Sequence, residues 1–288
     1  MTLTKYPIIV SFARSWRRDG RADSTVEGYS YCLVQLADHL GGETELVTAT
    51  RDELERYIDA RLHKVTASAV SFDVRAIKAF FKWTTEHGDT PLNPSMKLKH
   101  PKVDEPPVRV ATEHDLKKLL GTCDKRDRLG RRDAAILGLL AWGGLRRSET
   151  CALDVDDVEL DKRFVAIPRT KIGRPRQVPL HPDAVDLLDS WMRTRGKEPG
   201  PLFLSRTGRR LSPNAVGQMF ATRCALVGLD GLGTHAFRRG LAIRWLKGGG
   251  SETGLRAIAG WTSTRMVGTY TRMASEEIAA VEYRNIIG

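Results

Sequence analysis

The chain has 288 residues, 41% of them hydrophobic, and its 46 Lys and Arg against 35 Asp and Glu give a formal net charge of +11. This length is typical of two domains, and the hydrophobic content is enough for a core in each. The positive charge favours a polyanionic partner, first of all nucleic acid, and argues against an acidic or solvating role. Without a bilayer-spanning apolar run or a secretory signal, the expected location is cytoplasmic.

Residues 1–92 are predicted to form a small four-helix domain. Apolar residues recur at helical spacing over 8–18, 24–39, 50–62 and 68–87. Thr50 is expected to cap the third helix, because an acidic pair follows it closely. The fourth helix carries one apolar stripe that predicts a bundle core, made of Val70, Val74, Ile77, Phe80 and Phe81.

Repeated prolines then interrupt the helical pattern, and we interpret residues 93–110 as a linker. A second domain is expected over 111–288, where Thr112 and Asp115 have the spacing of a capping box. The segments FVAI and RQVPL flank a turn and predict a β-hairpin, and helices are expected over 181–195, 212–227 and 234–247. Residues 1–100 carry a net charge of +1 and the rest +10, so the second domain should hold DNA phosphates most strongly.

The cysteines predict neither a metal site nor a disulfide framework. Cys32, Cys123, Cys151 and Cys224 stand far apart, with no C-x-x-C pair and no histidine at ligand spacing. We expect reduced thiols in the core. No cofactor or metal ion is predicted from the sequence.

Three segments of the second domain match one catalytic pattern: GGLRRSE at 143–149, RTKIGRPRQVPL at 169–180, and THAFRRG at 234–240 followed by AGWTSTRMVGTYTR at 259–272. Together they resemble the tyrosine recombinase or phage integrase family. That family has an Arg in G-L-R-x-S-E, a Lys on a β-hairpin, an H-x-L-R-H box, and L-G-H/W with a Tyr nine positions after the His or Trp. The matching residues here are Arg146, Lys171, His235, Arg238, Trp261 and Tyr270.

The sequence departs from the family pattern at two places. Arg239 stands where a second His is usual, and the later box reads AGW instead of LGH. The indole of Trp261 can donate one hydrogen bond, but it cannot transfer a proton as an imidazole can.

The residue types fit the cleavage and rejoining of DNA without an energy source. A phenol such as Tyr270 can conserve the phosphodiester energy in a phosphotyrosine bond. Arg146 and Arg238 can stabilise the charge that develops on the phosphate, with His235 and the Trp261 N–H as further donors. Lys171 is a candidate general acid for the leaving 5′ oxygen. It could instead be one more phosphate contact in a basic turn.

Several neighbouring residues have weaker predictions. Glu149 is expected to orient Arg146 or a neighbouring basic group, and Arg174 and Arg176 are interpreted as DNA-backbone contacts. Taken alone, Trp261 and Tyr270 would be packing aromatics, and only the companion motifs favour catalysis. Solvated or phosphate-facing arginines are expected at Arg147, Arg239 and Arg272. Packing roles are expected for Tyr6, Tyr29, Tyr31, Tyr57 and Tyr283.

The sequence therefore predicts a site-specific DNA recombinase of a phage or mobile element. The resemblance implies a mainly α fold with a small β-hairpin, in which a SAM-like core-binding domain and a catalytic domain close as a C-shaped clamp on a duplex core site. It implies a small, Xer-like enzyme without an arm-site-binding domain. We expect a monomer in free solution and a homotetramer on paired DNA sites, with the C-terminal helix docked in cis or in trans. A type IB topoisomerase and a non-catalytic DNA-binding regulator are the alternatives.

Overall fold

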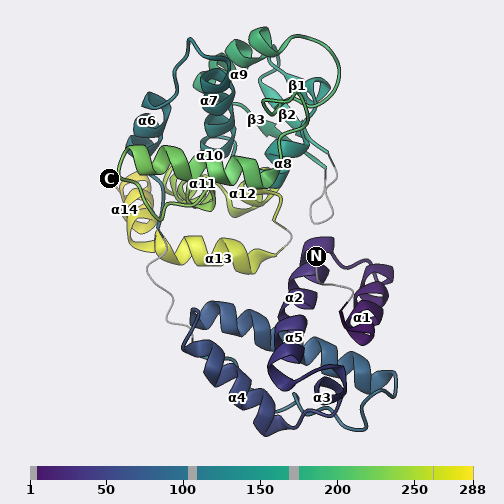
Figure 1. Ribbon diagram of the computed structural model, residues 1–288. Coiled ribbons are helices and arrows are strands. Elements are labelled where there is room, and N and C mark those ends of the chain that lie inside the picture. Colours follow the sequence, from purple (N-terminus) through teal and green to yellow (C-terminus); the bar gives the residue numbers. More distant parts are fainter. Residues whose placement is uncertain (1–4, 103–108, 169–174, 262, 288) are drawn as a thin grey trace. The chain divides into compact units, whose positions relative to one another are not determined.

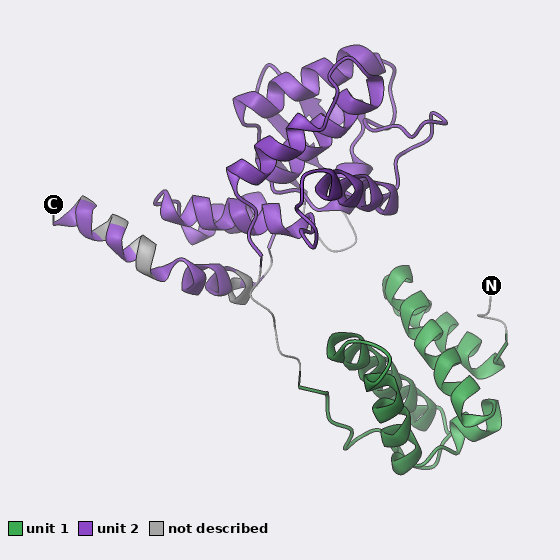
Figure 2. Ribbon diagram, turned by 60° about the vertical axis from the view of Figure 1, so that its left-hand side comes forward, with its two compact units in different colours: residues 1–106 green, residues 107–288 purple. Residues whose placement is uncertain are grey.

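The computed structural model describes residues 5–102, 109–168, 175–261 and 263–287. The chain divides into two compact units, residues 1–106 and residues 107–288 (Figure 2). Each unit has hydrophobic core clusters of its own.

Unit 1 is a bundle of helices, labelled in Figure 1 as α1 (Pro7–Arg18), α2 (Asp23–Leu40), α3 (Glu43–Val47), α4 (Arg51–Leu62) and α5 (Ala67–Glu86). The four predicted helices are confirmed, with each end within one residue of its expected place. The short helix α3 was not predicted, because five residues are too few to show a helical period. At the start of α4, the Thr50 side chain accepts from the Glu53 N–H and the Glu53 carboxylate accepts from the Thr50 N–H, which confirms the predicted cap.

The core of unit 1 is the apolar stripe of α5 packed against α1 and α2. Val70, Val74, Ile77, Phe80 and Phe81 are all fully buried, as predicted. Phe12 of α1 meets the Phe80 ring edge-on at 5.6 Å between centroids. Edge-to-face contacts of this kind add to the energy of simple burial.

Unit 2 is also mainly helical, which confirms the predicted fold class. Its helices are α6 (Glu113–Gly121), α7 (Arg128–Ala141), α8 (Arg147–Ala152), α9 (Pro182–Arg195), α10 (Pro213–Leu226), α11 (His235–Lys247), α12 (Glu252–Ala259), α13 (Thr264–Met273) and α14 (Ser275–Ile286), with a 3-10 turn at Val155–Asp157 (Figure 1). The predicted cap of α6 is also present, since the Thr112 hydroxyl accepts a hydrogen bond from the Asp115 N–H. Ser212 caps α10 in the same way.

A small antiparallel sheet stands beside these helices. It has the order β1-β2-β3, from strands Val158–Glu159, Phe164–Ile167 and Arg176–Pro179. Val165 pairs with Val178, and both side chains point into the core. The two predicted strands of the hairpin are confirmed, whereas β1 was too short to be predicted.

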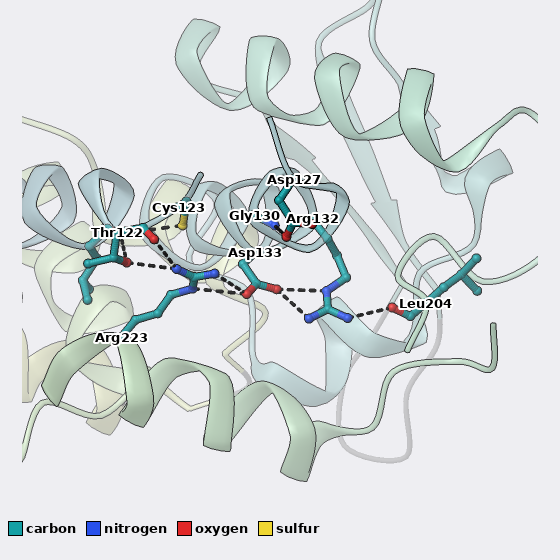
Figure 3. Close-up of polar contacts among 9 residues, drawn as sticks. Thr122, Cys123, Asp127, Gly130, Arg132, Asp133, Leu204 and Arg223 are labelled. Atoms are coloured by element: carbon teal, nitrogen blue, oxygen red, sulfur yellow. Dashed lines mark hydrogen bonds and ion pairs between the residues drawn. The ribbon is translucent and has the colours of Figure 1, made fainter. Parts of the chain in front are cut away.

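Helix α7 is the central element of unit 2. All residues from Asp133 to Ala141 are buried, because α7 packs against α9 and α11. Near the start of α7, the Asp133 carboxylate accepts two hydrogen bonds from Arg132, at 2.7 and 2.9 Å. It accepts two more from Arg223 of α10, at 2.5 and 3.2 Å (Figure 3). Arg223 also donates to the carbonyl oxygen of Thr122 at the end of α6. This buried charged cluster joins three helices.

All four cysteines are buried free thiols, which confirms the sequence prediction. Burial raises the pKa of the Cys151 thiol to about 11, so this group is inert at neutral pH. Among the described residues, no helix is long and apolar enough to cross a membrane.

Candidate active site

Unit 2 brings together residues from distant motifs of the sequence. Arg146 precedes α8, His235 and Arg238 lie in the first turn of α11, and Tyr270 lies on α13. Trp261 follows the end of α12. The remaining candidate, Lys171, falls in 169–174, outside the described residues.

Arg238 is a buried cation at the centre of this group, with 5% of its surface exposed. Its guanidinium donates to the carbonyl oxygens of Gly144 and Ala259, and it lies 5.2 Å from the centroid of the Trp261 ring. Burial, followed by the charge of Arg146, lowers the pKa of Arg238 to about 10. The group therefore stays charged at neutral pH, and its desolvation strengthens its attraction for an anion.

Glu149 holds Arg146 in place from one turn further along the chain. Its carboxylate accepts a hydrogen bond from Nη1 of Arg146 at 2.7 Å and another from the Arg146 backbone N–H at 2.8 Å. The Glu149 side chain is 1% exposed and the Arg146 side chain 24% exposed. Burial alone would raise the pKa of Glu149, but hydrogen bonds from Arg176 and from the Arg146 backbone outweigh it and lower the pKa to about 2. The predicted role of Glu149 in orienting a basic group agrees with these contacts.

Arg176 is not placed as the sequence analysis expected. The prediction of a DNA-backbone contact is wrong, because only 7% of its side chain is exposed. Two of its N–H groups reach the two oxygens of Glu149 at 3.0 and 2.9 Å, and its Nε donates to the carbonyl oxygen of Ile258 at 2.7 Å. The strand alternation could have shown this, since Arg176 shares a face of β3 with the buried Val178.

Gly260 ends α12 and sets the position of Trp261. Its backbone is left-handed, with φ 62° and ψ 42°, a conformation that residues other than glycine rarely adopt. A Cβ atom at this position would also lie 2.8 Å from Nη1 of Arg176. The glycine of the AGW segment is therefore required both by the helix end and by the packing of Arg176.

Trp261 and Tyr270 stack on each other. Their ring centroids are 5.1 Å apart and their planes differ by 10°. Trp261 is 5% exposed, and among the described residues its indole N–H has no hydrogen-bond partner. Burial raises the pKa of the Tyr270 phenol, although the charges of Arg239 and Arg238 act in the opposite direction. The phenol is thus neutral at physiological pH in the DNA-free protein.

His235 lies at the first position of α11 among several cations. Partial desolvation lowers its pKa, and the charges of nearby arginines, Arg238 and Arg147 foremost, lower it further. The imidazole is therefore uncharged at neutral pH. In this form one ring nitrogen donates a hydrogen bond and the other accepts one.

The chain matches a known protein family over most of unit 2. The model of the phage integrase family covers residues 109–277. The chain belongs to the phage integrase family. The tyrosine recombinase XerC of Myxococcus xanthus is 27% identical to it, with 91% of each chain covered. The tyrosine recombinase XerA of Pyrococcus horikoshii is 25% identical, with 97% of this chain and 94% of the relative covered.

Solved integrase structures share the fold of this family member. The Tn1549 transposon integrase in complex with transposon right end DNA has a TM-score of 0.74 and 18% identity, covering 98% of this chain and 99% of that one. A lambda integrase dimer bound to a COC′ core site has a TM-score of 0.73 and 17% identity, covering 91% of this chain and 75% of that one. The family prediction is confirmed: the protein is an enzyme of the tyrosine recombinase type, which supports a function in site-specific recombination.

The predictions for the arginines that border the motifs of this integrase-family chain are confirmed for some residues and not for others. Arg147 and Arg272 are exposed, as expected. Arg239 is instead half-buried, and it donates two N–H groups to the carbonyl oxygen of Arg109 at 3.0 and 2.8 Å. Arg174 lies outside the described residues.

Two of the five tyrosines expected to pack are on the surface. Tyr31 is 64% exposed and Tyr283 is 65% exposed, so that prediction is wrong for both. Tyr6 and Tyr57 are buried, and Tyr29 packs against the core of unit 1.

Proposed function

We propose that this protein is a site-specific recombinase that cuts and rejoins duplex DNA through a 3′-phosphotyrosine bond on Tyr270, and that it integrates or excises a phage or other mobile element. The proposal rests above all on one arrangement. The buried Arg238 guanidinium lies over the Trp261 ring, and the same ring stacks on Tyr270. A buried cation, an indole N–H and a phenol are thereby gathered beside Arg146.

Arg146 and Arg238 bind the scissile phosphate in this proposal. Both are guanidiniums, which pair with phosphate oxygens through charge-assisted hydrogen bonds. Their effect is greatest when the phosphorus becomes five-coordinate and negative charge increases on its non-bridging oxygens. The Trp261 N–H supplies a further donor to one of these oxygens.

Tyr270 is the nucleophile. Its phenolic oxygen forms a bond to phosphorus while the bond from phosphorus to the 5′ oxygen breaks, and the phenolic proton passes to a base. His235 suits this transfer because a neutral imidazole has one unprotonated nitrogen, which can accept a proton. Attack by a 5′ hydroxyl reverses the step, rejoins the DNA and releases the tyrosine.

Lys171 protonates the departing 5′ oxygen. An ammonium on a flexible side chain is able to reach a leaving group and deliver its proton. A role as a phosphate contact in the basic hairpin turn is the alternative, and the two roles differ in their response to the leaving group.

A duplex core site is the proposed substrate. The lambda integrase structure is described as bound to a core site, and the Tn1549 integrase structure holds transposon end DNA. We assign DNA binding to a core-binding domain at 1–92 and a catalytic domain at 111–288, joined by a linker at 93–110. The division of the chain into two units supports two domains, although it falls at residue 106 and places Leu98 in the core of unit 1.

A homotetramer on two paired sites is the proposed active assembly, formed from monomers that are free in solution. Tyr283 and Ile286 of the C-terminal helix α14 are exposed by 65% and 78%, and Ile287, which follows the helix, by 67%. A short terminal helix with exposed apolar groups gains stability by docking into a groove. Docking on a neighbouring protomer would link the copies, whereas docking on its own unit would not.

A nicked suicide substrate tests the function directly. Labelled site DNA is incubated with the protein, and covalent complexes are separated on a denaturing gel. We expect a covalent band that disappears in Tyr270→Phe and persists in Tyr31→Phe, which makes the same change at an exposed tyrosine. A band that survives Tyr270→Phe would overturn the assignment of the nucleophile. Relaxation of supercoiled DNA without a specific site would indicate a topoisomerase, and binding without any covalent band would indicate a regulator.

A further inference from the structure

Arg176 connects segments that hold different residues of the candidate site. From the start of β3, its guanidinium reaches both oxygens of Glu149 and the carbonyl oxygen of Ile258. We propose that Arg176 is a positioning residue for strand cleavage: it neutralises Glu149 so that Arg146 keeps its charge for the phosphate, and it fixes the end of α12 that carries Trp261. This inference rests on the proposed function.

The first part follows from how the Glu149 carboxylate is shared. Oε1 accepts one N–H from Arg146 and one from Arg176, and Oε2 accepts the Arg146 backbone N–H and a second N–H from Arg176. Among the described residues, the Arg146 guanidinium uses a single N–H in this contact. A guanidinium has five such donors, so Arg146 retains most of them for a ligand.

The charges of the three side chains also indicate that Arg146 remains available to a phosphate. Glu149 carries one negative charge in a site that is 1% exposed, where two opposite charges attract strongly. If Arg146 were its sole partner, the carboxylate and the phosphate would compete for one guanidinium. Because Arg176 makes a two-point contact with Glu149 and is itself buried, the trio keeps one net positive charge, on the arginine that is more exposed to solvent.

The second part concerns the end of α12. The last carbonyl groups of a helix have no partners inside the helix and carry a partial negative charge. Here Arg176 donates to the carbonyl oxygen of Ile258, and Arg238 donates to that of Ala259. Two guanidiniums therefore bind consecutive carbonyls directly before Gly260 and Trp261. Loss of Arg176 would remove one of these two contacts.

Single-turnover cleavage of the suicide substrate by Arg176→Met tests the inference. We expect site binding to stay near that of the parent, while cleavage at pH 8 falls about 100-fold, the size of effect that a small misplacement of catalytic groups produces. Arg193→Met makes the same change at an exposed arginine of α9 and should cleave like the parent. Arg176→Lys keeps the charge but has a single nitrogen as donor, so its cleavage rate should lie between those of Arg176→Met and the parent.

Two further readouts separate positioning from general damage to the fold. Lowering the pH protonates Glu149 once Arg176 is absent, which frees Arg146, so the ratio of Arg176→Met to parent cleavage should rise from pH 8 to pH 5. Glu149 is faced by three guanidiniums, those of Arg146, Arg176 and Arg238. His235 is present in the parent as well, so the ratio removes its effect.

The double variant Arg176→Met/Glu149→Gln removes the competing carboxylate. It should cleave about tenfold faster than Arg176→Met, a coupling of the size seen between residues in contact. A ratio that does not change with pH, together with a double variant no faster than the single one, would overturn the inference. So would parent-like cleavage by Arg176→Met. If the parent itself forms no covalent complex, the proposed function fails, and the role of Arg176 fails with it.

Discussion

Trp261 and Tyr270 form a parallel stack, with 5.1 Å between ring centroids and 10° between planes. The two residues come from different elements, since Trp261 follows the left-handed turn at the end of α12 and Tyr270 lies on α13. The stack therefore determines where α13 presents its phenol. The Arg238 guanidinium also lies over the Trp261 ring, 5.2 Å from its centroid.

Variants at Trp261 should separate the stack from the hydrogen bond. Trp261→Phe keeps an aromatic ring but has no N–H donor, and Trp261→Ala has neither. We expect the cleavage rate to fall in Trp261→Phe. In Trp261→Ala it should be lower again by roughly 2- to 10-fold, the range that an aromatic pair contributes. Single-turnover cleavage measures both. Equal rates for the two variants would show that the stack has no part in placing Tyr270.

Loss of either arginine of the proposed phosphate site should reduce cleavage and spare binding. Arg146→Ala and Arg238→Lys, which keeps a charge at the buried position, are expected to cleave about 10²- to 10³-fold more slowly, because their bonds strengthen as charge develops. Gel-shift affinity should change little. Arg272→Ala, at an exposed arginine, provides a comparison for simple phosphate contacts. Parallel losses of binding and cleavage in Arg146→Ala would assign Arg146 to that class.

A change of leaving group should reveal the role of Lys171. A substrate with sulfur in place of the 5′-bridging oxygen has a leaving group that needs little protonation. This substrate should restore cleavage by Lys171→Ala and should not restore cleavage by Arg146→Ala. If sulfur rescues neither variant, Lys171 is a backbone contact.

Removal of residues 275–288 should separate site binding from assembly. This deletion takes away α14 with its exposed Tyr283, Ile286 and Ile287. We expect single-site binding to persist and the paired-site complex to disappear on a native gel. The double variant Ile286→Ser/Ile287→Ser should weaken the same complex without shortening the chain. Normal pairing by the deleted protein would refute docking in trans.

Asp133 should be a major determinant of the stability of unit 2. Asp133→Ala leaves the buried Arg132 and the largely buried Arg223 without their shared carboxylate (Figure 3). Breaking a buried ion pair in this way costs about 3–5 kcal/mol of unfolding free energy. Asp189→Ala, which removes the partner of Arg193 in an exposed pair on α9, should cost at most about 1 kcal/mol. Urea unfolding of both variants tests the difference, and equal losses would contradict it.

Much of the fold could be predicted because its determinants are local. The helices of unit 1 follow from apolar residues at a fixed period, and the caps at Thr50 and Thr112 need partners only three residues away. The catalytic candidates could be predicted for a related reason. They have characteristic types and spacings within short segments, such as the nine positions from Trp261 to Tyr270. Short elements without a full period, namely α3 and β1, could not be predicted in this way.

The tertiary structure alone decided the pairing of Arg176 with Glu149. In the sequence, Arg176 belongs to a basic turn and its local context is that of a solvated, DNA-facing residue. In the fold, it lies against Glu149, which is 27 positions away, and against a carbonyl oxygen 82 positions away. Burial makes an unpaired charge costly, so Arg176 and Glu149 are held together by the surroundings that chain folding creates. Because those surroundings come from three separate segments, no local pattern around Arg176 could specify them.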